Sequence, residues 1–176
     1  MAYVAVPPGA PGIVGLLEAF PHTARALNQL AQVLLRGPST LTPGEREMIA
    51  THVSRLNDCT FCASAHAAVA RHLLDDPSPV DALGGKPEDV PVSDRLRALL
   101  AIAEQVQRGG KCVTEEHIER ARRHGATDQE IHDTVLIAAA FCMFNRYVDG
   151  LGTWAPKDPE VYDSIGAQLA AEGYPT

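Results

Sequence analysis

The sequence has no cluster of basic side chains. Its 15 Lys and Arg residues are outnumbered by 22 Asp and Glu residues, which gives a formal charge of −7 and a pI near 5.4. A nucleic-acid surface needs Lys and Arg gathered on one face to neutralise phosphates. We therefore expect no nucleic-acid partner.

Targeting and membrane-spanning segments are also missing. The opening residues, MAYVAVPPGAPG, lack the basic start and the unbroken apolar run of a secretory signal. The longest apolar run, Val135 to Phe144, is shorter than the roughly 20 residues that cross a bilayer. The sequence thus predicts a soluble, cytoplasmic protein with no membrane partner, in which this run forms a buried helix.

No segment alternates between apolar and polar residues for long enough to indicate a strand. Helix signals recur instead, and Thr42-Pro43-Gly44-Glu45 combines a capping box with proline at the first helical position. A chain of 176 residues has the size of one ordinary domain. The expected fold is therefore all-α, a bundle of about seven helices in a single domain of residues 1–176, with residues 127–149 as its central helix.

Prolines mark two irregular segments. Residues 1–12 hold three prolines, which lack amide donors, and are expected to form an extended N-terminal arm. Residues 75–92 hold four prolines and a Gly-Gly pair, which predicts a loop with room for one helical turn.

The chain has four cysteines, and without a secretory signal they do not suggest a disulfide scaffold. Cys59 and Cys62 form a close pair and precede His66 at the spacing C-x-x-C-x-x-x-H. Cys112 and Cys142 have no close cysteine in the sequence, and each is expected to be a small packing residue. A close pair followed by a histidine indicates redox or metal chemistry.

A helix that begins at Cys59, capped by Asn57 or Asp58, aligns Cys59, Cys62 and His66 on one face. Residues three apart on a helix have Cα atoms about 5 Å apart, a separation that a disulfide accepts. The helix N-terminus favours a thiolate at Cys59, and His66 can relay a proton to or from Cys62. The stretch can thus supply a nucleophile, a resolving thiol and a base.

Other interpretations fit the same residues. The motif supplies three zinc ligands, but no second cysteine pair or histidine cluster completes a tetrahedron. A c-type haem needs histidine directly after the second cysteine, where this chain has Ala63. An ordinary buried stripe has the same spacing. Twelve residues before Cys59, Glu47 lies opposite the apolar stripe of its own helix, so periodicity alone predicts a solvated surface acid.

Residues 41–66, LTPGEREMIATHVSRLNDCTFCASAH, resemble the core motif of the alkylhydroperoxidase D-like, or carboxymuconolactone decarboxylase, superfamily. Its peroxidase-related branch has Glu and then C-x-x-C-x-x-x-H at this separation, and residues 138–152, AAAFCMFNRYVDGLG, resemble the following helix of that branch. The resemblance spans about residues 13–155. It implies an all-helical homo-oligomer that reduces hydroperoxides through the cysteine pair, without a cofactor or metal.

The family pattern implies roles for four residues. Cys62 corresponds to the peroxidatic thiol, Cys59 to the resolving thiol, and His66 with Glu47 to a proton relay. We follow this assignment, although the helix dipole favours Cys59 as the thiolate. At Phe61 the chain departs from the best-known members, which carry a histidine there, so a relay that needs that histidine is incomplete.

We therefore predict a thiol-dependent hydroperoxide reductase with a dithiol and disulfide cycle, whose electron donor is a dithiol such as a lipoyl or thioredoxin-like protein. One alternative is a carboxymuconolactone decarboxylase-like enzyme in which acid and base groups act and the cysteines are dispensable. Another is a non-catalytic oligomeric module that senses redox state or binds zinc.

Overall fold

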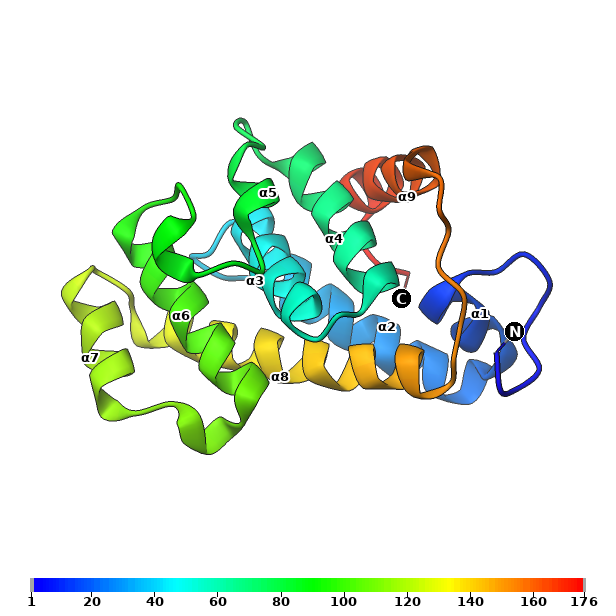
Figure 1. Cartoon of the computed structure of the whole chain (residues 1–176), viewed down its shortest axis with the longest axis horizontal. Helices are drawn as coiled ribbons and strands as arrows, with labels where there is room; N and C mark the ends of the chain where they lie inside the picture. The colour runs from blue at the N-terminus through cyan, green and yellow to red at the C-terminus, as the bar shows by residue number, and fades with distance from the viewer. Residues whose placement is uncertain (1, 176) are drawn as a thin grey trace.

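The computed structural model describes residues 2–175, so the two ends of the predicted domain, residues 1 and 176, lie outside it. Within this range the chain forms nine α-helices, two 3-10 turns and no strand, which confirms the all-α prediction (Figure 1). The elements are α1 (Gly12–Ala19), α2 (Pro21–Arg36), α3 (Pro43–Leu56), α4 (Thr60–Leu73), α5 (Pro79–Ala82), a 3-10 turn (Pro87–Asp89), α6 (Asp94–Arg108), a 3-10 turn (Gly110–Cys112), α7 (Glu115–Arg123), α8 (Asp128–Gly150) and α9 (Pro159–Glu172).

The most enclosed helix is α3. Ten of its 14 residues are buried, against 11 of the 23 residues of α8, and it packs against α2, α4, α6 and α8. The prediction that residues 127–149 form the central helix is therefore wrong, and α8 exposes Leu136 and Met143 as it runs along one side of the molecule (Figure 1). The hydropathy of the sequence did not show that α3 is the most buried helix, because half of its buried residues are polar, namely Arg46, Glu47, Thr51, His52 and Ser54.

The two irregular segments are tied to the helices around them. In the N-terminal arm, the backbone N–H of Tyr3 donates to the carbonyl of Leu151 at 2.8 Å. The loop of residues 75–92 contains α5 and one 3-10 turn, in line with the predicted helical turn. Arg55 of α3 fastens this loop by donating to the carbonyl oxygens of Val80 and Leu83, each at 2.8 Å.

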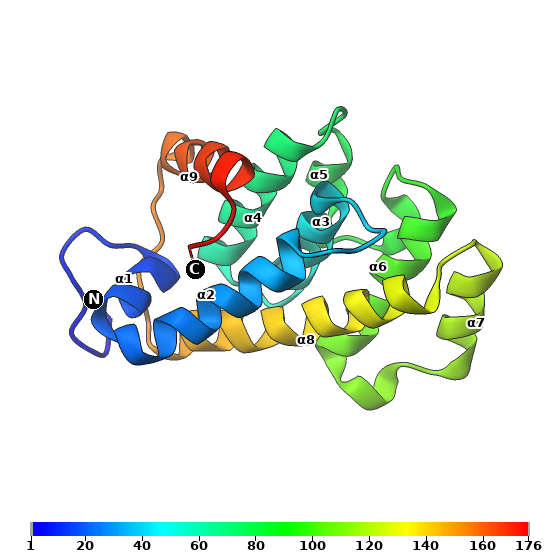
Figure 2. The ribbon, with the colours of Figure 1, turned by 180° about the vertical axis from the view of Figure 1, so that it is seen from behind.

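The C-terminal segment folds back toward the start of the molecule. After α9 the chain turns toward α2 and α4 (Figure 2). Gly173 has a positive φ of 76°, a conformation in which a side chain is strained, and it makes this turn. The backbone N–H of Tyr174 then donates to Oε1 of Gln32 at 2.8 Å. These contacts bring Tyr174 to the buried junction of α2, α3 and α4.

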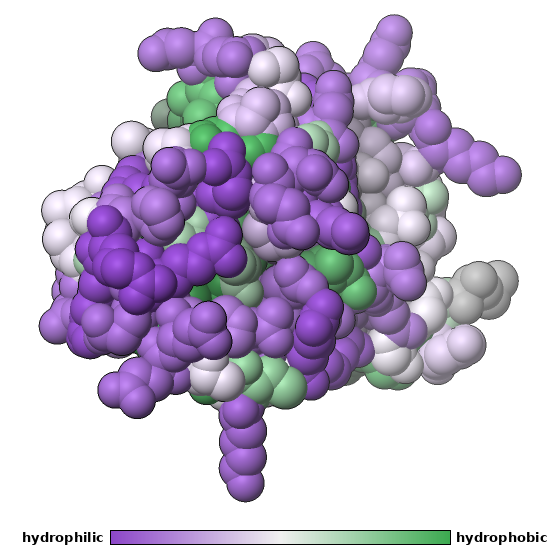
Figure 3. Space-filling view, turned by 60° about the vertical axis from the view of Figure 1, so that its left-hand side comes forward, coloured by the Kyte–Doolittle hydropathy of each residue, from purple (hydrophilic) through white to green (hydrophobic). Residues whose placement is uncertain are grey.

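The surface at the end formed by α6 and α7 consists mainly of hydrophilic side chains, with smaller apolar areas between them (Figure 3). In the part of the chain that the structure describes, no helix combines the length and the apolar character needed to span a bilayer.

Candidate redox site

A tight connection between α3 and α4 positions the cysteine pair. Asn57 ends α3, Asp58 adopts a positive φ of 57°, and the extended residue Cys59 precedes the first turn of α4. Aspartate tolerates this left-handed conformation better than most residues. The predicted start at Cys59 is therefore one residue early, and Cys59 itself is the N-cap in place of Asn57 or Asp58. Cys62 consequently lies in the first turn of α4.

Both thiols are free and buried, in an apolar cluster that includes Phe61 and Tyr162. The Cys59 thiol donates a hydrogen bond to the Cys62 sulfur, which lowers the pKa of Cys62 against the opposing effect of burial, and His66 lowers it further. The same hydrogen bond, together with burial, raises the pKa of Cys59. These effects favour Cys62, and not Cys59, as the thiolate, because Cys59 is the donor in the hydrogen bond that the two sulfurs share.

Asn145 of α8 supports the same sulfur from the other side. Its Nδ2 donates to Oγ of Ser54 at 3.1 Å, and its Oδ1 accepts from Nδ2 of Asn57 at 2.9 Å. A hydrogen bond from Asn145 also lowers the pKa of Cys62. Sequence analysis assigned no role to Asn145, although it lies in the second stretch that resembles the family.

Glu47 is fully buried, so the prediction of a solvated surface acid is wrong. The reason is that α3 is packed on all sides, including the side opposite its apolar stripe. Oε2 of Glu47 lies 2.7 Å from Nδ1 of His66, and Oε1 accepts from Arg36 at 2.7 Å. Burial raises the pKa of Glu47, but the interactions with His66 and Arg36 outweigh it and lower the pKa. Glu47 is thus held as a buried carboxylate.

Tyr174 completes this cluster, and sequence analysis missed it. Its hydroxyl donates to Oε1 of Glu47 at 2.8 Å and lies 3.1 Å from Nδ1 of His66. The guanidinium of Arg36 lies 5.2 Å from the centre of the Tyr174 ring. Burial and the Glu47 carboxylate raise the pKa of Tyr174, so its hydroxyl stays protonated. No local motif marks this residue, because it lies 127 positions beyond Glu47 in the sequence.

Phe61 occupies the place where the best-known relatives have histidine. Its ring is buried, and its centre lies 6.0 Å from that of Tyr162. Gly12, which has a positive φ of 52°, leaves room for this ring, since a Cβ there would lie 2.2 Å from two of its atoms. Position 61 therefore belongs to the apolar side of the site and is separate from the charged cluster around Glu47.

The other two cysteines differ from each other. Cys142 is buried, as expected of a packing residue, and its sulfur accepts from Nδ2 of Asn57 at 3.7 Å. Cys112 is exposed in a 3-10 turn, so the same prediction is wrong for it. Among residues 2–175, no three His, Cys, Asp or Glu side chains gather where they could hold a metal ion.

Two solved structures resemble this chain closely. One is described as an alkylhydroperoxidase AhpD core, an uncharacterized peroxidase-related protein from Ralstonia eutropha JMP134, with a TM-score of 0.79 and 29% identity over 89% of this chain and 81% of that one. The other is an uncharacterized peroxidase-related protein from Silicibacter sp. TM1040, with a TM-score of 0.75 and 30% identity over 85% of this chain and 78% of that one.

A protein of unknown function from Agrobacterium tumefaciens shares the fold, with a TM-score of 0.72 and 21% identity over 84% of this chain and 99% of that one. A search of curated proteins gave no match. The model of the carboxymuconolactone decarboxylase family matches residues 21–105 and 81–155. Together these two matches cover most of the sequence and include the cysteine pair, His66, Glu47 and Asn145. The chain belongs to the carboxymuconolactone decarboxylase family, in the alkylhydroperoxidase D-like superfamily.

Proposed function

We propose that this protein is a thiol-dependent hydroperoxide reductase. The observation that carries the proposal is the buried carboxylate of Glu47, bound at 2.7 Å to His66, one helical turn beyond a cysteine whose pKa is lowered. A buried carboxylate that orients an imidazole beside a thiol is the arrangement that activates a nucleophile. The names of the two peroxidase-related structural neighbours support the same reaction class.

In the first step Cys62 attacks the hydroperoxide. The Cys62 thiol gives its proton to Nε2 of His66, because Nδ1 is engaged by Glu47. The thiolate then attacks the distal peroxide oxygen, the O–O bond breaks, and the leaving alkoxide takes the proton from His66. The products are an alcohol and a sulfenic acid at Cys62. Glu47 stabilises the imidazolium between these two proton transfers, and Tyr174 holds Glu47 in place.

In the second step Cys59 resolves the sulfenic acid. Its sulfur attacks the Cys62 sulfur, water leaves, and a disulfide forms between two residues that already interact. An external dithiol, lipoyl or thioredoxin-like, then reduces this disulfide by thiol exchange and is itself oxidised. The protein returns to its starting state with one hydroperoxide reduced and one donor dithiol oxidised.

The bond state of the cysteine pair tests the proposal directly. One equivalent of hydroperoxide should join Cys59 to Cys62, seen by mass spectrometry as the loss of two hydrogens from the peptide that contains both residues. A dithiol should then restore the thiols and support repeated peroxide consumption. If both thiols remain free after peroxide and no dithiol supports turnover, the proposal is wrong.

The family match favours one alternative, a decarboxylase-like enzyme that uses acid and base groups. Glu47, His66 and Tyr174 supply such groups, and this reaction does not need the sulfurs. A variant with serine at both Cys59 and Cys62 separates the two functions. If the protein is a decarboxylase-like enzyme, the variant should keep its decarboxylase activity on a lactone that carries a carboxylate. If it is a hydroperoxide reductase, the variant should lose its peroxidase activity.

We also propose that the protein assembles into a homo-oligomer. Helices α2 and α8 lie side by side (Figure 2). Each exposes large apolar side chains, Val33 at 65% on α2 and Met143 at 43% with Leu136 at 40% on α8. Apolar side chains exposed close together are typical of interaction surfaces. Light scattering should give a mass that is a multiple of 18.8 kDa. The variant Val33→Asp should shift this mass toward one chain.

A further inference from the structure

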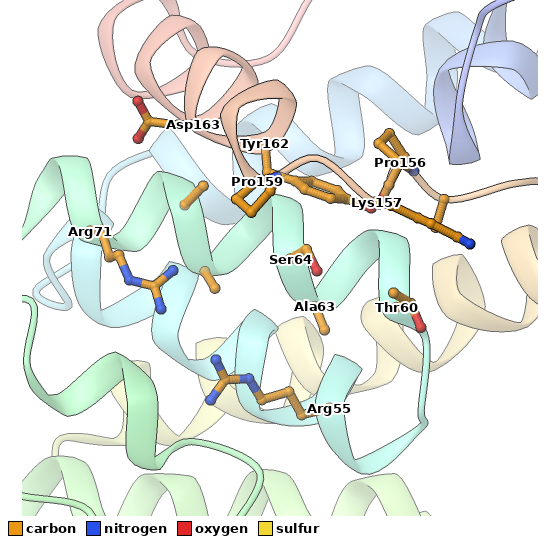
Figure 4. Close-up of a pocket in the computed structure, with 13 residues that line it drawn as sticks. Arg55, Thr60, Ala63, Ser64, Arg71, Pro156, Lys157, Pro159, Tyr162 and Asp163 are labelled. Atoms are coloured by element: carbon orange, nitrogen blue, oxygen red, sulfur yellow. Dashed lines mark hydrogen bonds between the residues drawn. The ribbon is translucent and has the colours of Figure 1, made fainter.

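A groove of about 760 Å³ runs along α4 (Figure 4). His66, the residue of α4 that contacts Glu47, is not among its lining residues. The walls of the groove come from α4, from the start of α9 and from the segment between α8 and α9. A volume of this size is within the range of small-molecule sites.

The groove is cationic although the protein is acidic. Three lining residues, Arg55, Arg71 and Lys157, are basic, and Asp163 is the one acid, in a chain whose formal charge is −7. The carboxylate of Asp163 is engaged by His72 at 2.9 Å. A concave site lined by one sign of charge concentrates ligands of the opposite sign. The groove therefore selects for anions.

The basic side chains are only partly neutralised within the protein. Nη1 of Arg55 donates to the carbonyl oxygens of Val80, Asp81 and Leu83, which carry no formal charge. Arg71 pairs with the Asp81 carboxylate at 2.6 Å in an exposed ion pair, which water and salt weaken. Burial and the nearby charge of Arg71 lower the pKa of Arg55. Among the described residues, no carboxylate pairs with Lys157.

The floor of the groove is apolar. The small side chains of Ala63, Ala67 and Ala68 lie along α4, and Pro156 with Tyr162 forms the wall beside them (Figure 4). A bare inorganic anion would leave this surface uncovered, whereas a short alkyl chain would bury it at a gain of about 25 cal/mol per Å². The groove thus fits a molecule with an anionic head and an apolar body.

The groove also adjoins the cysteine pair. Tyr162 lines it and belongs to the apolar cluster around Cys59 and Cys62. The hydroxyl of Tyr162 donates to the carbonyl of Pro156 at 3.0 Å, in the irregular segment before α9. The side chain of Tyr162 is therefore the wall between the groove and the sulfurs.

We propose that this groove binds an alkyl carboxylate. Arg55 and Arg71, whose charges lie close enough to affect one another, attract the carboxylate at one end of the groove, and the alanine floor covers the alkyl chain (Figure 4). This binding does not depend on the proposed hydroperoxide reductase function.

Calorimetry with octanoate tests the binding site, and the Cys62→Ser protein avoids any redox reaction. Octanoate should bind at least about tenfold more tightly than 1-octanol, because the two differ mainly in charge. Arg71→Gln should weaken octanoate binding several-fold, and Lys157→Gln, at the other end of the groove, should weaken it less (Figure 4). Lys111→Gln, which removes an exposed charge far along the sequence, should leave it unchanged. Equal affinity for the acid and the alcohol, or unchanged octanoate binding in Arg71→Gln, would overturn the proposal.

Discussion

The two faces of α4 differ in how deeply their charged side chains are buried. On the inner face, His66 meets the fully buried Glu47, which is also bound by Arg36 and Tyr174. On the outer face, Arg71 pairs with an exposed carboxylate and lines an open groove. A buried charge is costly unless it is paired and hydrogen-bonded, whereas an exposed one is cheap and stays available to a ligand. The inner face is therefore suited to chemistry and the outer face to binding.

The largest effect is expected from Cys62→Ser on the inner face. Serine has no thiol, and its hydroxyl is not ionised at neutral pH. Peroxide turnover should therefore fall by about three orders of magnitude or more. The measurement is peroxide consumption with excess dithiol. Cys112→Ser, which changes an exposed cysteine, should retain full activity. Substantial turnover in the Cys62→Ser protein would exclude the proposed nucleophile.

Glu47→Gln should slow the oxidation of Cys62 by about a hundredfold, because the amide does not stabilise a positive His66. It also leaves Arg36 without its carboxylate, so the free energy of unfolding should fall by about 3 kcal/mol. Stopped-flow peroxide kinetics and urea unfolding measure the two effects. Glu104→Gln, which breaks a pair with Arg108 at the surface, is the matched control and should leave both values nearly unchanged.

The same variant should change the pH profile. Because its pKa is lowered, Cys62 remains a thiolate at pH values at which an ordinary cysteine is protonated. The rate of Cys62 oxidation is lost as the pH falls through this lowered pKa. Gln at position 47 removes the carboxylate that positions His66, so the lowering effect of His66 on the pKa of Cys62 weakens and the midpoint moves to higher pH. A profile that coincides with that of the wild type would show that Glu47 does not act through the thiol.

Tyr174→Phe should have a smaller effect, a decrease of about tenfold in the rate of Cys62 oxidation. The ring and its contact with Arg36 remain, and one hydrogen bond to a charged oxygen is lost. Because Tyr174 acts through Glu47, the substitution should have little further effect in the Glu47→Gln protein. Tyr147→Phe, on α8, is the control. Additive effects of the two substitutions would show that Tyr174 acts independently.

The smallest effect is expected from Asp81→Asn, which breaks the ion pair with Arg71 beside the groove. This pair is exposed, so the thermal midpoint should shift by no more than about 2 °C. Differential scanning calorimetry checks this. A large loss of stability would mean that the exposed pair of Arg71 and Asp81 contributes to folding as strongly as the buried cluster around Glu47.

Local signals in the sequence located the helices well. The capping box predicted at Thr42 is present, and α3 begins at Pro43, as the proline at the first helical position indicated. The grouping of Cys59, Cys62 and His66 follows from helical spacing alone. In contrast, Glu47 and Tyr174 are brought together by tertiary packing. Periodicity describes one helix at a time, so it could not show that the polar side of α3 is covered or that the C-terminal segment returns to it.

The ring at position 61 limits how this site could be redesigned. Restoring the histidine of the best-known relatives by Phe61→His would place an imidazole against the backbone of Gly12 and the ring of Tyr162, on the apolar side of the cysteines. Such a histidine would need a new polar partner before it could carry protons. A functional graft would therefore also have to change the backbone at Gly12, where the N-terminal arm meets α1.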